Sequence, residues 1–113
     1  MAAILGLLWS QAALAHAFPE RTDPRVGAVT NSVPHQVRIW FDADLEPAFS
    51  TLRVLDAQGR QVNRDTGQVS DQQARLLETP LPPLAPGVYH VFWRVIARDG
   101  HATEGDYSFT VGR

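Results

Sequence analysis

Cysteine is absent from the 113-residue sequence, and Met1 is its one methionine. The lack of thiols excludes disulfides, thiolate nucleophiles, iron–sulfur clusters and blue-copper centres. Lysine is absent too, so the ten basic residues are all arginine and stand against twelve acidic ones. The net charge of −2 provides no cationic surface of the kind that binds nucleic acid, so we expect no nucleic-acid partner.

A long hydrophobic run is also lacking. Residues 1–15 (MAAILGLLWSQAALA) contain no charged side chain and combine a short apolar stretch with a small-x-small ending, Ala13-Leu14-Ala15. This pattern is typical of a secretory signal peptide. The stretch falls short of the ~20 apolar residues that a membrane-spanning helix needs, which argues against a membrane anchor. We therefore expect cleavage after Ala15 and a soluble mature domain of residues 16–113.

No segment of the mature chain has the apolar stripe of an amphipathic helix. Apolar and polar residues instead alternate with period two, which indicates β-strands. The pattern predicts strands at residues 36–42, 51–55, 61–64, 74–78, 88–97 and 106–111. Several short strands in about a hundred residues predict an all-β fold, a small Greek-key β-sandwich or barrel.

His16 is distinguished by the predicted cleavage, because it becomes the N-terminal residue. A free N-terminal histidine offers its amine and its ring Nδ1 to one metal ion, closing a chelate ring. The pKa of an α-amino group is about 7.7–8, so a metal displaces its proton at modest cost near neutral pH. Two nitrogens held in this way suit the tetragonal geometry that Cu(II) prefers.

The segment Asp99-Gly100-His101 can supply further ligands, since it lies in an expected turn between the last two predicted strands. Side chains two residues apart can point to one side of an extended or turning segment, and a glycine between them permits a tight bend. Taken alone, the segment also fits an ordinary exposed turn. Together with His16 it forms a set of three nitrogens and one oxygen, suited to one Cu(II) ion.

Other candidate chemistry in the chain is weaker. His35 follows Pro34 in an expected loop, and His90 lies in the middle of a strand, so neither is assigned to the metal. No serine has the glycine context of a nucleophile elbow, and no glycine-rich phosphate loop is present. The sequence therefore predicts a binding protein rather than an enzyme.

Segments along the whole mature chain resemble the CopC (PcoC-like) family of periplasmic copper-resistance proteins. In order they are His16-Ala17-Phe18, Arg21-Thr22-Asp23-Pro24, Val37-Arg38-Ile39-Trp40-Phe41, Glu46-Pro47-Ala48-Phe49-Ser50, Val54-Leu55-Asp56, Leu84-Ala85-Pro86-Gly87-Val88-Tyr89, Trp93-Arg94-Val95, Asp99-Gly100-His101 and Gly105-Asp106-Tyr107-Ser108-Phe109-Thr110-Val111. Each segment is short, but their order over residues 16–111 makes the resemblance specific.

The resemblance implies an immunoglobulin-like (cupredoxin-like) β-sandwich in the periplasm. It also implies that His16, Asp99 and His101 hold one Cu(II) ion, and that an inner-membrane transporter of the CopD type is a partner. Some family members bind Cu(I) through a methionine-rich loop, and this chain has no methionine after Met1. The resemblance further implies that Asp42 or Asp44 takes the place of a glutamate that supports the metal in other family members.

Three functions remain open on the sequence. The first is a Cu(II) carrier or buffer in copper resistance or homeostasis. The second is a copper oxidase that uses the same N-terminal histidine, as polysaccharide monooxygenases do. The third is a metal-free immunoglobulin-like binding module.

Overall fold

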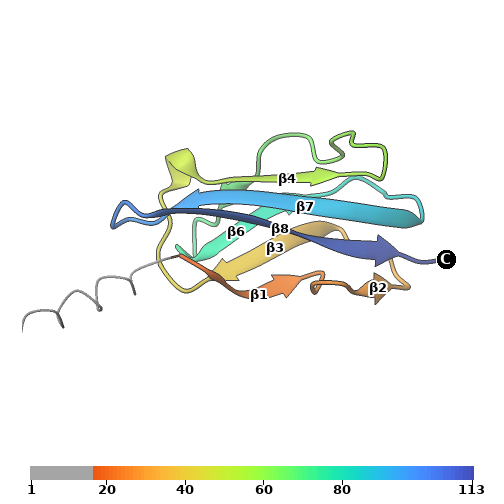
Figure 1. Cartoon of the computed structure of the whole chain (residues 1–113), viewed down its shortest axis with the longest axis horizontal. Helices are drawn as coiled ribbons and strands as arrows, with labels where there is room; N and C mark the ends of the chain where they lie inside the picture. The colour runs from red at the N-terminus through yellow and green to blue at the C-terminus, as the bar shows by residue number, and fades with distance from the viewer. Residues whose placement is uncertain (1–16) are drawn as a thin grey trace, which may run out of the picture.

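The computed structural model describes residues 17–113, and these form two four-stranded β-sheets packed face to face (Figure 1). The first sheet has the order β1-β3-β6-β5, and the second has the order β2-β8-β7-β4. The strands are β1 (Pro19–Asp23), β2 (Val29–Thr30), β3 (Gln36–Phe41), β4 (Thr51–Leu55), β5 (Gln68–Val69), β6 (Leu76–Pro80), β7 (Gly87–Ile96) and β8 (Ala102–Val111). The predicted all-β fold is confirmed, and of the two expected forms the chain adopts the sandwich.

The core lies between the sheets and consists of the apolar residues that alternate along the long strands. On β3, for example, Val37, Ile39 and Phe41 are buried while the residues between them are more exposed. The same alternation buries Tyr89, Val91, Trp93 and Val95 of β7 and Tyr107, Phe109 and Val111 of β8. The apolar face of each sheet is removed from water by packing against the other sheet, which accounts for the alternation along the strands.

Most of the predicted strands are present. The strand expected at 51–55 is β4 without change. The strand expected at 36–42 is β3, which ends one residue earlier, and the strand expected at 88–97 is β7, which is shifted by one residue to 87–96. The strand expected at 74–78 is shifted to β6, and β8 begins four residues earlier than expected. The prediction at 61–64 is wrong, because there the structure has a loop with a single bridge between Leu55 and Gln61.

The three strands that the sequence did not predict are short or polar. β1 pairs antiparallel with β3, and β2 then crosses to the other sheet, where Val29 pairs with Thr110 of β8 in a parallel register. The first part of the described chain therefore contributes an edge strand to each sheet. β1 begins at the end of the sandwich where β3 ends (Figure 1).

The predicted signal peptide, residues 1–15, and His16 lie outside the described residues. Within residues 17–113 no helix is long and apolar enough to cross a bilayer.

Candidate metal centre

Asp99 and His101 lie in the turn that connects β7 to β8. The backbone NH of Ala97 donates to the carbonyl of His101 (2.9 Å), and that of Gly100 donates to the carbonyl of Ala97 (2.8 Å). Gly100 has a φ of 96°, a left-handed conformation that glycine adopts without steric cost. The glycine between the two candidate ligands is therefore what allows this tight turn.

The turn brings the side chains of Asp99 and His101 together. The carboxylate oxygen Oδ1 of Asp99 accepts a hydrogen bond from the backbone NH of His101 (3.0 Å) and lies 3.1 Å from the ring Nδ1 of the same residue. The two side chains are 43% and 47% exposed, respectively. A carboxylate that bonds the backbone two residues ahead forms an Asx turn, so this local geometry follows from the short sequence itself.

A second segment, the connection between β3 and β4, runs along this turn. The carbonyl of Asp44 accepts from the backbone NH of Arg98 (3.0 Å), and the backbone NH of Glu46 donates to the carbonyl of Ile96 (2.8 Å). Leu45 forms a bridge with Ala97. We call this region, formed by the β7–β8 turn and residues 42–46, the hairpin end of the sandwich.

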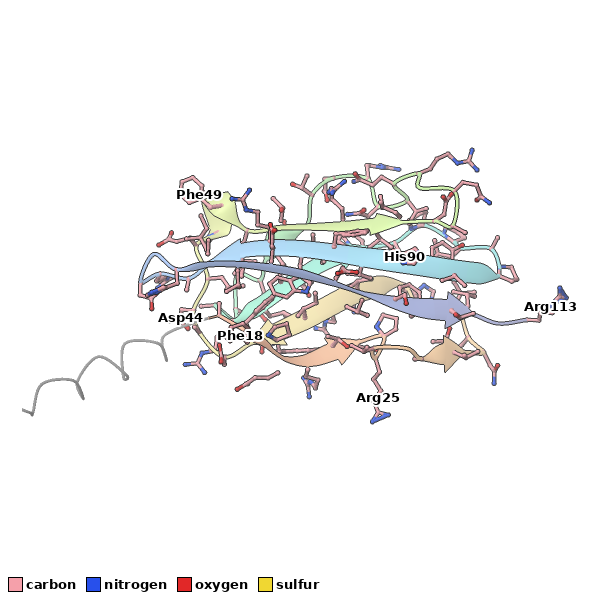
Figure 2. All side chains as sticks on the ribbon, viewed as in Figure 1. Phe18, Arg25, Asp44, Phe49, His90 and Arg113 are labelled. Carbon is pink, nitrogen blue, oxygen red and sulfur yellow. The ribbon has the colours of Figure 1, made fainter. Side chains whose placement is uncertain are left out.

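The first described residues also reach the hairpin end. Ala17 is fully buried, and its carbonyl accepts a hydrogen bond from the hydroxyl of Thr103 at 2.6 Å. Thr103 lies in β8, two residues after His101. Figure 2 shows Phe18 and Asp44 at this end of the sandwich and Arg113 at the other.

Asp42 and Asp44, the two candidates for a supporting carboxylate, have different partners. The Oδ1 atom of Asp42 accepts from the backbone NH of Phe18 (2.8 Å), and the backbone NH of Asp42 donates to the carbonyl of Phe18 (3.0 Å). The carboxylate of Asp44 instead pairs with the guanidinium of Arg75 (3.3 Å). Of the two, Asp42 is the one that contacts the segment following His16.

The donor chemistry of this region fits a Cu(II) ion in part. Ligands at right angles, each about 2 Å from one ion, are roughly 3 Å apart, which is close to the separation of Asp99 Oδ1 and His101 Nδ1. Within residues 17–113 no group of three or more His, Asp or Glu side chains is arranged to hold a metal. His16, the further donor that the sequence predicts, lies outside the described residues.

The other histidines lie apart from this region. His90 is exposed on β7, where it pairs with Ser108 and Leu55, and His35 is exposed before β3. Figure 2 shows His90 away from the labelled residues of the hairpin end. Neither histidine therefore belongs to the hairpin end.

Sequence reasoning did not identify Thr103 or Ala17 as part of this region. Their hydrogen bond joins residues that are 86 positions apart. A threonine in a strand and an alanine near a terminus are common, so neither carries a local signal that predicts the contact.

Comparison with known proteins supports the resemblance seen in the sequence. Residues 19–112 match the CopC domain family. The crystal structure of CopC from Methylosinus trichosporium OB3b is similar to this fold, with a TM-score of 0.80 and 34% sequence identity, and the match covers 86% of this chain and 94% of that one.

Two curated relatives carry names that refer to copper. Copper resistance protein C of Xanthomonas campestris pv. juglandis is 29% identical, over 92% of this chain and 86% of its own length. Copper transport protein CutJ of Bacillus subtilis (strain 168) is 27% identical over 88% of this chain, which is 18% of its own length. The family match spans nearly the whole described sandwich, and the chain therefore belongs to the CopC family.

Proposed function

We propose that cleavage after Ala15 releases a periplasmic domain, residues 16–113, that binds one Cu(II) ion and carries or buffers copper in copper resistance or homeostasis. Membership of the CopC family supports this proposal, as do the names of the relatives CutJ and copper resistance protein C. The ion is cargo in this function, so the proposal requires no chemical reaction and no enzyme activity.

The observation that carries the proposal is the hydrogen bond between Thr103 and the carbonyl of Ala17. Successive residues of an extended chain advance by at most ~3.6 Å, so a residue bonded to Ala17 stays within a short reach of that anchored carbonyl. Thr103 is in turn two residues from His101. The contact therefore supports a site in which residue 16 meets Asp99 and His101, although 83 positions separate it from Asp99 in the sequence.

In this site the residues have separate roles. His16 would contribute its new amine and its ring nitrogen, Asp99 a carboxylate oxygen, and His101 an imidazole nitrogen. Such a nitrogen-rich set favours Cu(II), which binds most strongly to N and O ligands among the divalent first-row metals. The absence of cysteine, and of methionine after Met1, leaves no soft sulfur ligand for Cu(I) in the mature domain.

The relative CutJ supports a transport protein as the partner. The segment that matches this chain is a small part of that longer protein, which is named for copper transport. We infer that the domain passes its ion to an inner-membrane copper transporter of the CopD type.

The deciding experiment compares two N-termini on the same domain. Protein that begins at His16, verified by mass, is titrated with Cu(II) against a competing chelator, beside a variant with one extra glycine before His16. We expect one ion per chain in the first protein and much weaker binding in the second, because the added residue converts the amine into an amide.

A His101→Ala variant tests the other side of the site and is also expected to bind weakly. His90→Ala is its matched control, since it removes an exposed histidine from the same sheet. Equal affinity in the glycine-extended and native proteins would contradict the proposed site. Ascorbate-driven oxidation of polysaccharide by the copper-loaded protein would indicate an oxidase instead of a carrier.

A further inference from the structure

Ala17 and Phe18, the described residues that precede β1, are hydrogen-bonded to the sandwich. The hydroxyl of Thr103 donates to the carbonyl of Ala17 (2.6 Å), the backbone NH of Phe18 donates to Asp42 Oδ1 (2.8 Å), and the backbone NH of Asp42 donates to the carbonyl of Phe18 (3.0 Å). Two of the three use a side chain rather than the backbone ladder of a sheet. The segment is thus fixed between β8 of one sheet and the end of β3 in the other.

We propose that Thr103 is a positioning residue for copper binding: by fixing the carbonyl of Ala17, its hydroxyl sets where the N-terminal amine stands relative to Asp99 and His101. This inference rests on the proposed function and adds a residue that is not itself a ligand. A binding site is tight when its groups are held in place before the ligand arrives, because ordering them on binding costs free energy.

The position of Thr103 in β8 explains why it can act in this way. It pairs with Val95 of β7, close to the turn that carries Asp99 and His101, so it belongs to the same rigid hairpin as both of them. Its side chain is partly buried and reaches a chain segment that leads into the opposite sheet. One hydroxyl therefore connects the two halves of the proposed site.

Ala17 adds a steric reason for the precise placement. The side chain of Ala17 is fully buried within the hydrophobic core, which fixes the position of this residue against the sandwich. Both the side chain and the carbonyl of Ala17 are therefore held in place at the start of the described chain. Loss of the Thr103 hydroxyl would free the carbonyl while leaving the buried methyl group in place.

The test removes the hydroxyl of Thr103 while keeping the shape of its side chain. Thr103→Val removes the donor with little change in volume, Thr103→Ser retains it, and Thr103→Ala serves as a second hydroxyl-free variant if the valine protein does not fold. All are prepared with His16 as the N-terminal residue. We expect Cu(II) affinity to fall roughly tenfold in the hydroxyl-free variants, since a residue must then be ordered on binding, and to return toward the native value in Thr103→Ser.

The matched control is Thr30→Val. The hydroxyl of Thr30 also donates to a backbone carbonyl, that of Thr110 (3.4 Å), but at the opposite end of the same sheet. This variant is expected to keep native Cu(II) affinity. The electron paramagnetic resonance spectrum of bound Cu(II) should change in Thr103→Val and stay native in Thr30→Val, a difference that a general loss of stability would not produce.

The same Thr103 variants are also compared in proteins that carry one glycine before His16. This comparison separates the positioning role of Thr103 from the proposed copper site itself. If Thr103 acts through the amine, Thr103→Val has no further effect once that amine is an amide. Native affinity and spectrum in Thr103→Val, or an equal loss in the extended protein, would overturn the positioning role while leaving the copper site intact. If the glycine extension does not weaken the unsubstituted protein, both proposals fail.

Discussion

Asn63 shows how one side chain can take the place of a strand. Its Oδ1 atom accepts from the backbone NH of Val54 (2.8 Å), and its Nδ2 atom donates to the carbonyl of Leu52 (3.0 Å), so the amide pairs with the open edge of β4. The same Nδ2 atom also donates to Thr79 of β6 in the other sheet. Residues 61–64 were predicted as a strand, and the side chain of Asn63 explains why a loop covers this edge instead.

The substitution Asn63→Ala is expected to lower the free energy of unfolding by about 2–4 kcal/mol, because it leaves two buried backbone groups of β4 without partners. Urea denaturation followed by circular dichroism measures this change. Arg64→Ala, at the exposed neighbouring position, should change stability by no more than about 0.5 kcal/mol. A loss below about 1 kcal/mol in Asn63→Ala would show that the loop can satisfy β4 without this side chain.

Among the elements, the hairpin of β7 and β8 connects the core to the proposed metal centre. Its two ten-residue strands pair in one continuous register, from Gly87 with Val111 to Ile96 with Ala102, and then turn through Asp99 and His101. Gly105 faces Trp93 across this pair, and a Cβ atom at Gly105 would lie 2.6 Å from Cζ2 of the indole. The glycine is therefore needed for the bulky Trp93 to pack beside β8.

Gly105→Ala is expected to destabilise the fold by about 1–3 kcal/mol, since the indole must move within a packed core. The ring of Trp93 contacts that of Phe41 in the other sheet, with centroids 5.2 Å apart, so the shift should also change the near-ultraviolet circular dichroism spectrum. Glu104→Ala, on the exposed face of the same strand, is the control and should leave that spectrum native. A native spectrum and native stability in Gly105→Ala would mean that the space beside Trp93 is not restricted.

At the scale of the whole molecule, the proposed site joins parts that are remote in the sequence. The N-terminal segment contacts β8 through Thr103 and the end of β3 through Asp42. An ion held between this segment and the β7–β8 turn would therefore link both sheets. Since unfolding separates these parts, the bound ion should stabilise the whole domain.

We expect Cu(II) at a hundred times its dissociation constant to stabilise the protein that begins at His16 by about 2.7 kcal/mol. For a domain of this size that corresponds to an increase in melting temperature of roughly 10–20 °C, measurable by calorimetry. Addition of a chelator should reverse the increase. The same increase in the glycine-extended protein would indicate that the ion binds elsewhere.

Three strands of the sandwich and the local part of the site follow from the sequence alone. β3, β4 and β7 were predictable because alternation of apolar and polar residues is a property of neighbouring positions, and the sandwich buries one face of each. The proximity of Asp99 and His101 was predictable for the same reason, since a glycine turn acts over three residues. The metal role of His16, Asp99 and His101 remains a prediction.

The strands β1 and β2 and the long-range contacts depend instead on how the chain packs in three dimensions. β1 has the polar sequence PERTD and exists because β3 offers it an open edge, and the two-residue β2 depends on β8 in the same way. The hydrogen bonds of Thr103 to Ala17 and of Asp42 to Phe18 depend on how the two sheets meet at the hairpin end. Such contacts join residues far apart in the chain, so no periodicity or spacing indicates them before the sheets are packed.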